Sequence, residues 1–378
     1  MNKNHDKCID IAKGIGILFM VLGHASFPFS KFVYFFHIPL FFILAGYVFK
    51  DKYIDSWDNV KIFMFKRLKS LYLPYIICNL TFVFFNNFFI EHNIYTTNPL
   101  FLEGNLGNHF GIDKLLNLKD LILKVFYILL LATGDKLCGS TWFLKVLFFI
   151  SIFFAIITYF LKKYTNKDKV FYLLGFLITT IFLIIGFIFY KVNFKFYQIG
   201  VIFSSSILFY IGYCIKKYNI VEKITFKIFE ISFLILLISC FIFDKGINLS
   251  VNKYYNPLLL IIFSLTGFVF TIYISKLINK LKKISNIFQI LGAKTLPILC
   301  LHLLFFKFVT YLQVILYSLP DYRLASSLCY YTEKWWILYT LVGIIGPLIT
   351  NYLYLNIKNY FLFNIFDKIK ININQRRN

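Results

Sequence analysis

The stretch DIAKGIGILFMVLGHASFPFSKFVYFFHIPLFFILAGY, residues 10–47, decides how the rest of the chain is interpreted. Its first apolar segment carries three ionisable groups, Asp10, Lys13 and His24, and the second, after a proline break, carries His37. In a helix, Lys13 and His24 lie roughly 20° past three full turns from each other and about 16 Å apart along the axis, so they share one face. Asp10 lies one turn before Lys13 on that face. Ionisable groups on one face of an apolar helix are costly in a bilayer and indicate a functional site.

The composition is typical of a membrane protein. The 378 residues are 59% hydrophobic, 21% aromatic and only 15% charged, which excludes an ordinary soluble domain. The net charge of +23 does not require nucleic acid, because the basic residues form short clusters between apolar runs, as the positive-inside rule predicts. The seven cysteines are scattered without a C-x-x-C pair, so we expect neither a metal site nor a disulfide framework. Asp10 and Lys13 interrupt the first segment and no A-x-A site follows, so it is interpreted as a retained span and not as a signal peptide.

The sequence predicts an all-α fold, a polytopic membrane protein with about ten transmembrane helices of about 20 residues each. These spans cover residues 8–26, 32–49, 71–90, 142–161, 169–190, 197–215, 226–243, 257–275, 296–317 and 335–355. With the amino terminus inside, the cytoplasmic segments hold 27 of the 40 Lys and Arg residues, which predicts that both termini are cytoplasmic. Because no repeat or linker is visible, residues 1–378 are expected to form a single membrane domain without a soluble appendage.

Two regions do not fit a simple up-and-down bundle. The outer loop from Glu91 to Asp120 is the longest polar stretch, and it is either a solvated connection or a part of the acceptor site. The segment from Leu121 to Ala132 is apolar but too short to span, which predicts a re-entrant or interfacial piece.

The residues of several segments carry a family resemblance. The segments DIAKGIGILFMVLGH at 10–24 and FHIPLFFILAGY at 36–47 resemble the start of the acyltransferase-3 family, and more narrowly its fucose-4-O-acetylase-like branch. The family signature, a basic residue followed after ten positions by a histidine, is matched by Lys13 and His24. Lysine in place of the usual arginine keeps the charge but loses bidentate recognition. A second strong resemblance follows at STWFLKVLF (from Ser140), and weaker ones lie at KRLKSLYLPY (66–75) and LPILCLH (296–302).

The resemblance implies an integral-membrane O-acyltransferase in the cell (inner or plasma) membrane. It would take an acetyl group from acetyl-CoA on the cytoplasmic side and transfer it to a hydroxyl of a surface polysaccharide or a lipid-linked glycan. Membrane lipid would surround it. We predict no metal and no nucleic-acid partner, and the oligomeric state is left open, a homo-oligomer included.

Acyl transfer to an alcohol requires a base, because an alcohol is a poor nucleophile at neutral pH, and histidine is the usual choice. We therefore expect His24 to be the general base or, alternatively, a covalent acyl carrier. His37 either binds the acceptor or orients His24, or is an interfacial residue bonded to water. Asp10 and Lys13 either form a structural ion pair or meet the phosphates or pantetheine of the donor.

Five further positions are candidates for binding. The basic run Lys66, Arg67 and Lys69 obeys the positive-inside rule, and Arg67 is the position expected to bind the donor's phosphates. Trp142 is either an interfacial anchor or a pocket wall. His302 is either a polar member of the site or a residue hydrogen-bonded between helices.

Two other functions fit the composition. A transporter or flippase of a lipid-linked sugar would also place ionisable residues and broken helices in the membrane. A membrane-embedded scaffold is the third possibility. The absence of inverted repeats and the clustering of polar residues on the first helix favour the enzyme.

Overall fold

The computed structural model describes residues 3–102, 111–326, 328 and 334–375, so part of the predicted outer loop lies outside the described residues. The described part is almost entirely helical, with one isolated β-bridge between Asn248 and Lys253. The first half contains α1 (Lys3–His24), α2 (Ser30–Tyr34), α3 (His37–Tyr47), α4 (Trp57–Arg67), α5 (Leu73–Phe84), α6 (Asn86–Glu91), α7 (Leu118–Leu129) and α8 (Trp142–Tyr164). The second half contains α9 (Asp168–Lys191), α10 (Ile199–Lys217), α11 (Ile220–Lys223), α12 (Phe226–Ile242), α13 (Pro257–Asn279), α14 (Lys282–Ala293), α15 (Thr295–Leu316) and α16 (Trp336–Gln375).

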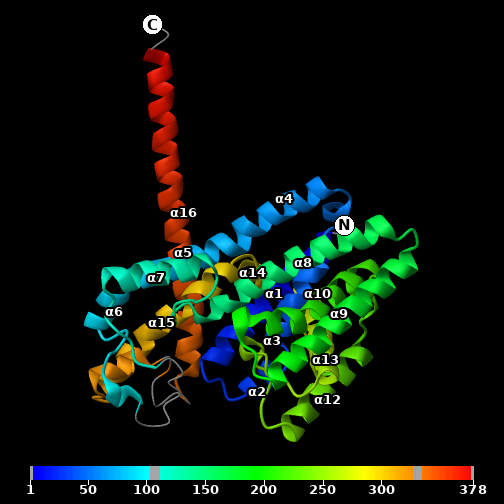
Figure 1. Cartoon of the computed structure of the whole chain (residues 1–378). Coiled ribbons are helices and arrows are strands. Elements are labelled where there is room, and N and C mark those ends of the chain that lie inside the picture. The colour runs from blue at the N-terminus through cyan, green and yellow to red at the C-terminus, as the bar shows by residue number, and fades with distance from the viewer. Residues whose placement is uncertain (1–2, 103–110, 327, 329–333, 376–378) are drawn as a thin grey trace.

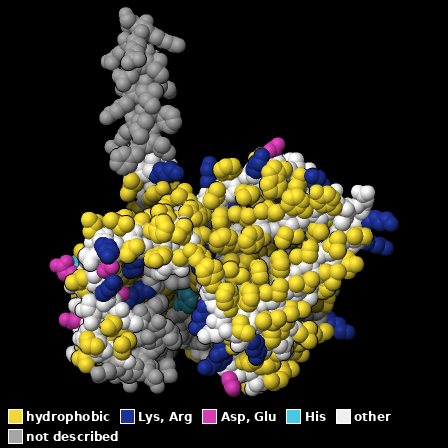
Figure 2. Space-filling model, viewed as in Figure 1, with side chains coloured by type: hydrophobic (Ala, Val, Ile, Leu, Met, Phe, Trp, Pro, Cys, Tyr) yellow, Lys and Arg dark blue, Asp and Glu magenta, His cyan; other side chains and the backbone are white. Residues whose placement is uncertain are grey.

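These helices confirm an all-α, polytopic membrane fold. Seven helical segments of the described chain are long and apolar enough to cross a bilayer. Each of the other three predicted spans also contains a helix. However, α1 is interrupted by the charged residues Asp10 and Lys13, and α12, with 17 residues, and α5, with 12, are short for a span. The count of ten and the cytoplasmic termini therefore stay predictions. Figure 2 shows a face covered mainly by apolar side chains, with Lys and Arg near its margins, as expected for a surface in contact with lipid.

The charged helix α1 lies inside the bundle, where it contacts α3, α13, α14, α15 and α16 (Figure 1). It ends at His24 because Ser26 adopts a left-handed conformation (φ 57°) and Pro28 follows. Gly14 packs against α14, and Gly16 packs against Leu40 and Phe41 of α3. A Cβ at Gly14 would lie 2.1 Å from the Phe288 carbonyl oxygen, so only glycine permits this approach.

The predicted span 71–90 is a broken helix. α4 continues through a π-helical turn, Leu68–Tyr72, into α5, and α6 follows after a bend. Pro74 explains the turn, because it cannot donate the helical hydrogen bond to residue 70 and its ring crowds that carbonyl. The short predicted segment at 121–132 corresponds to α7, whose Leu118, Ile122 and Phe126 are exposed. Exposed apolar residues on a short helix are compatible with the predicted interfacial position.

Candidate active site

His24 and His302 form a hydrogen-bonded pair between α1 and α15. The His24 Nδ1 and His302 Nε2 atoms are 2.8 Å apart, and the ring centroids are 5.1 Å apart. His302 is fully buried, whereas His24 is partly accessible. Two residues separated by 278 positions in sequence are thus brought together at the end of α1.

The hydrogen bonds of His302 determine the tautomers of both rings. Its Nδ1 lies 2.9 Å from the carbonyl oxygen of Ile298 and 3.1 Å from that of Leu299. A carbonyl oxygen only accepts, so His302 Nδ1 carries the proton and its neutral Nε2 is an acceptor. His24 therefore donates from Nδ1, which leaves the lone pair on His24 Nε2 free. An oriented neutral imidazole with a free nitrogen is suited to take a proton.

His37 is held separately from this pair. Its Nδ1 donates to the carbonyl oxygen of Val33 at 3.0 Å, and the ring packs edge-on against Tyr34 at 5.0 Å. The Tyr34 hydroxyl in turn donates to the carbonyl oxygen of Gly23 at 3.2 Å. The structure thus places His37 next to the end of α1 through Tyr34, with its own hydrogen bond directed to Val33 and not to His24.

An inner cavity of about 290 Å³ approaches the histidine pair from the side of Lys13 and Arg67. Its walls are mainly apolar, and Met20 and Leu299 line it one helical turn before His24 and His302 respectively. Its lining residues are Lys13, Ile17, Met20, Ile38, Phe41, Leu44, Ala45, Val48, Arg67, Ser70, Leu71, Phe143, Leu144, Leu147, Gly292, Thr295, Leu296 and Leu299. The cavity is thus an apolar passage with two cations in its wall.

These two cations differ in their partners. Lys13 forms an ion pair with Asp10 at 2.9 Å, as one of the two interpretations predicted. The Arg67 guanidinium lies 4.7 Å from the Phe63 ring centroid, and its buried Nε has no hydrogen-bond partner among the described residues. Burial lowers the pKa of Arg67. A phosphate bound at Arg67 would satisfy this donor and reverse the cost of burying it.

The other two basic residues of the run do not reach the cavity. Lys66 and Lys69 are exposed, and Lys66 Nζ donates to the Tyr53 hydroxyl at 3.4 Å. Arg67 and Ser70 lie about one turn apart and share the face that lines the cavity, whereas Lys66 and Lys69 lie on an adjacent face. Of the run, only Arg67 lines the inner cavity.

Trp142 lines a different cavity, on the opposite face of the first turns of α8. This outer cavity measures about 470 Å³. Trp142 and Lys145 face it, whereas Phe143, Leu144 and Leu147 face the inner cavity. Its lining residues are Tyr75, Ala132, Thr133, Gly134, Asp135, Lys136, Cys138, Gly139, Thr141, Trp142, Lys145, Lys195, Tyr197 and Gln198. The sequence analysis missed Lys145, although a lysine one turn after Trp142 in an apolar span was a usable signal.

The wall of the outer cavity is cross-linked by a disulfide between Cys78 and Cys138. The expectation that no disulfide is present was therefore wrong. The two cysteines lie 60 positions apart, and no spacing rule connects them because the pairing depends on how α5 packs against the loop. Asn79 adds two hydrogen bonds to this loop, donating to Thr141 Oγ1 at 3.1 Å and accepting from the Asp135 amide at 2.6 Å.

Asp135 and Tyr95 complete the wall. The Tyr95 hydroxyl donates to Asp135, whose carboxylate also accepts from the Leu137 amide at 2.9 Å. Burial raises the pKa of Asp135 and, together with the Asp135 charge, that of Tyr95. Tyr95 lies in the outer loop, so a part of this loop packs into the structure and is not merely a solvated connection.

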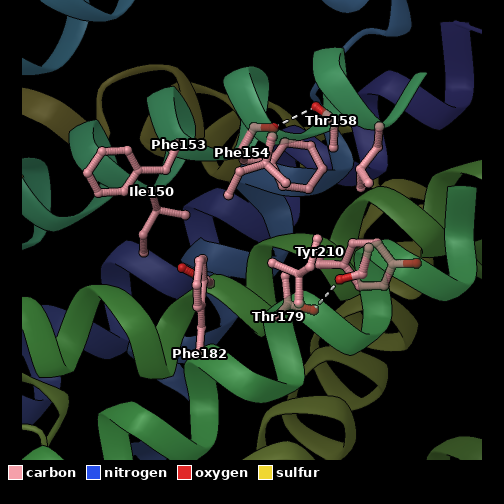
Figure 3. A pocket seen from close by; sticks show the side chains of 12 residues that line it. Ile150, Phe153, Phe154, Thr158, Thr179, Phe182 and Tyr210 are labelled. Atoms are coloured by element: carbon pink, nitrogen blue, oxygen red, sulfur yellow. Dashed lines mark hydrogen bonds between the residues drawn. The ribbon is translucent and has the colours of Figure 1, made fainter. Parts of the chain in front are cut away.

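A third cavity, between α8, α9 and α10, has no group suited to the chemistry (Figure 3). It measures about 20 Å³, and its Thr158 and Thr179 hydroxyls donate to backbone carbonyls of their own helices. Such a volume holds about one water molecule. Within the described residues, no three His, Cys, Asp or Glu side chains come together in a way that could hold a metal ion.

Comparison with known families gives one match. A family model described as an acyltransferase domain matches residues 6–355. It covers both histidines of the pair and the linings of both large cavities. Neither the curated proteins nor the solved structures contain a match to this chain.

Proposed function

The chain belongs to this acyltransferase family, and we propose that it transfers an acetyl group from acetyl-CoA to a hydroxyl of a cell-surface or lipid-linked carbohydrate. The observation that carries this proposal is the His24–His302 pair, which leaves His24 Nε2 unprotonated one helical turn beyond Met20 and Leu299 in the wall of the inner cavity. The family assignment favours an enzyme over a flippase of a lipid-linked sugar. The resemblance to the fucose-4-O-acetylase-like branch supports acetyl as the acyl group and a sugar as the acceptor.

The inner cavity suits the donor. Its two cations, Lys13 and Arg67, would meet the phosphates of coenzyme A, and the apolar walls would surround the pantetheine arm. Met20 and Leu299 would then flank the thioester, one turn before the histidines. Positive-inside bias places this mouth on the cytoplasmic side, where acyl-CoA is made.

The transfer step follows from the free nitrogen of His24. His24 Nε2 takes the proton from the acceptor hydroxyl while the hydroxyl oxygen forms a bond to the thioester carbon. The C–S bond of the tetrahedral intermediate then breaks, and the proton on His24 passes to the departing sulfur of coenzyme A. His302 accepts the His24 Nδ1 hydrogen throughout, so it orients the base and stabilises its charged form without itself meeting the substrate.

The test is acetyl transfer by purified protein in lipid vesicles supplied with radiolabelled acetyl-CoA and glycans extracted from the source cells. The His24→Ala variant should transfer about 100- to 10,000-fold more slowly, which is the usual contribution of a general base. His92→Ala is the matched control, because His92 is exposed on the outer side, bonded to its own helix at Phe88. Transfer by a folded His24→Ala protein at the control's rate would exclude the assignment. Absence of any labelled ester from the wild-type protein would favour the flippase or the scaffold.

A further inference from the structure

The outer cavity has the character of a ligand site. Its volume of about 470 Å³ falls in the range of pockets for small molecules, about 300–1,000 Å³. Its lining is polar, unlike that of the inner cavity, and contains hydroxyl, amide and ammonium groups. The disulfide and the hydrogen bonds of Asn79 hold its wall in one conformation.

The charges that face this cavity do not balance. Lys136 pairs with Asp113, so its charge is neutralised. Lys145 is 7% exposed and Lys195 is exposed, and neither has an acidic partner among the described residues. The remaining acidic group, Asp135, is already bonded to Tyr95 and to a backbone amide. The cavity therefore presents two unpaired ammonium groups, one of them nearly buried, which favours an anionic ligand.

A spare acceptor lies on the opposite wall. The Gln198 Nε2 donates to the Ser250 carbonyl oxygen at 3.0 Å, but Gln198 Oε1 is buried without a hydrogen-bond partner among the described residues. Tyr197 and Gln198 both adopt positive φ values, 49° and 57°, which are rare for residues with side chains. Strained backbone that holds an unsatisfied acceptor at a cavity is a feature of binding sites. Because this oxygen is buried, a ligand hydroxyl would reach it only after the Gln198 side chain turned toward the cavity.

The outer cavity is linked directly to the histidine pair. Gly139 and Thr141 line it, and Ser140 between them donates to the Leu299 carbonyl oxygen at 2.6 Å. The same Leu299 oxygen accepts from His302 Nδ1 at 3.1 Å. The floor of the cavity and the orientation of His302 therefore depend on one carbonyl group.

We propose that the outer cavity binds the acceptor, and that this acceptor is a carbohydrate carrying a carboxylate or a phosphodiester. The indole of Trp142 covers an apolar face of a sugar ring, and Lys145 binds the anionic group. This inference rests on the proposed function, because it assigns the second substrate of the same reaction. It places the acceptor on the opposite face of α8 from the donor.

Binding without acetyl-CoA tests the inference separately from transfer. Purified protein in nanodiscs of neutral phosphatidylcholine is titrated calorimetrically with tetragalacturonate, with its uncharged methyl ester, and with a short polyprenyl diphosphate carrying one N-acetylglucosamine. We expect at least one anionic probe to bind at least tenfold more tightly than the methyl ester. Binding of tetragalacturonate identifies an acidic sugar as the source of the anion, and binding of the diphosphate alone identifies a lipid carrier.

Two variants connect that binding to the cavity. Lys145→Met should lower the affinity for the anionic probe at least tenfold. Lys145→Arg keeps the charge and should retain the affinity of the wild type. Lys163→Met, at the far end of α8, is the matched control and should bind as the wild type does. Equal binding by Lys145→Met and the control, or no preference for either anionic probe over the ester, would overturn the inference. If His24-dependent transfer persists in that case, the proposed function stands and only the acceptor site is wrong.

Discussion

The inner and outer cavities share one helix, α8, and differ in nearly every other respect. Phe143, Leu144 and Leu147 face an apolar passage, whereas Trp142 and Lys145 face a polar space closed by a disulfide. Consecutive residues of one helix therefore line two cavities of opposite character. An apolar passage suits a flexible thioester arm, and a rigid polar cavity suits a hydroxylated acceptor. The histidine pair lies one turn beyond Met20 and Leu299 of the inner cavity and is connected to the outer cavity through the Leu299 carbonyl oxygen.

The largest expected effect concerns the rigid wall of the outer cavity. The double variant Cys78→Ser with Cys138→Ser should lose about 2–4 kcal/mol of unfolding free energy, because the disulfide restricts the unfolded chain. Thermal unfolding in detergent measures the loss. Cys240→Ser is the control, since Cys240 is a free cysteine outside both cavities. Labelling of both residues by a thiol reagent in unreduced wild-type protein would contradict the cross-link.

The next effect concerns the pair between the cavities. His302→Leu should lower kcat by about 10- to 100-fold, the usual cost of losing an orienting partner. His302→Gln should retain most of the wild-type kcat, because the carbonyl oxygen of the glutamine side chain can accept the His24 Nδ1 hydrogen. A purely structural role for His302 would give two variants with equal rates and equally lowered thermal stability.

A smaller effect is expected at the inner cavity. Arg67→Ala should raise the KM for acetyl-CoA about tenfold, corresponding to one charge-assisted hydrogen bond, and leave the KM for the acceptor unchanged. Initial rates at varied concentrations of each substrate give both constants. Lys61→Ala is the control, because Lys61 pairs with Asp58 on the surface. Equal rises in both constants would remove the distinction between the two cavities.

The smallest effect is expected at the exposed basic residues. Lys66→Ala and Lys69→Ala should each change the KM for acetyl-CoA by less than about twofold, because exposed charges contribute little. The same rate measurements apply. A rise equal to that of Arg67→Ala would show that general positive charge, and not a position in the cavity wall, attracts the donor.

Much of the fold followed from the sequence, because the hydrophobic runs and breaks are local properties. The predicted span at 8–26 corresponds to α1, and the break after it corresponds to Ser26 and Pro28. The position of Lys13 and His24 on one face of the helix could also be predicted, since it depends only on helical geometry. The predicted span at 71–90 was less accurate, because a π-helical turn and a bend divide it.

The candidate site was predicted only in part. His24 and His302 were each selected from the sequence, but their hydrogen bond was not, because contacts over 278 positions depend on packing. Arg67 was singled out from its basic run, but only the structure shows that Lys66 and Lys69 are exposed and lie outside the inner cavity.

The sequence by itself determined that this is a helical membrane protein of the acyltransferase kind with ionisable groups on its first helix. Composition and local spacing are sufficient for the membrane helices and their polar exceptions, because a bilayer demands long apolar helices. The acyltransferase assignment came from the resemblance of the motifs to a known family. Only the tertiary structure decided which nitrogen of His24 is free, which basic residue reaches the inner cavity, and that Cys78 joins Cys138. These depend on distances between helices, and such distances follow from the packing of the whole bundle.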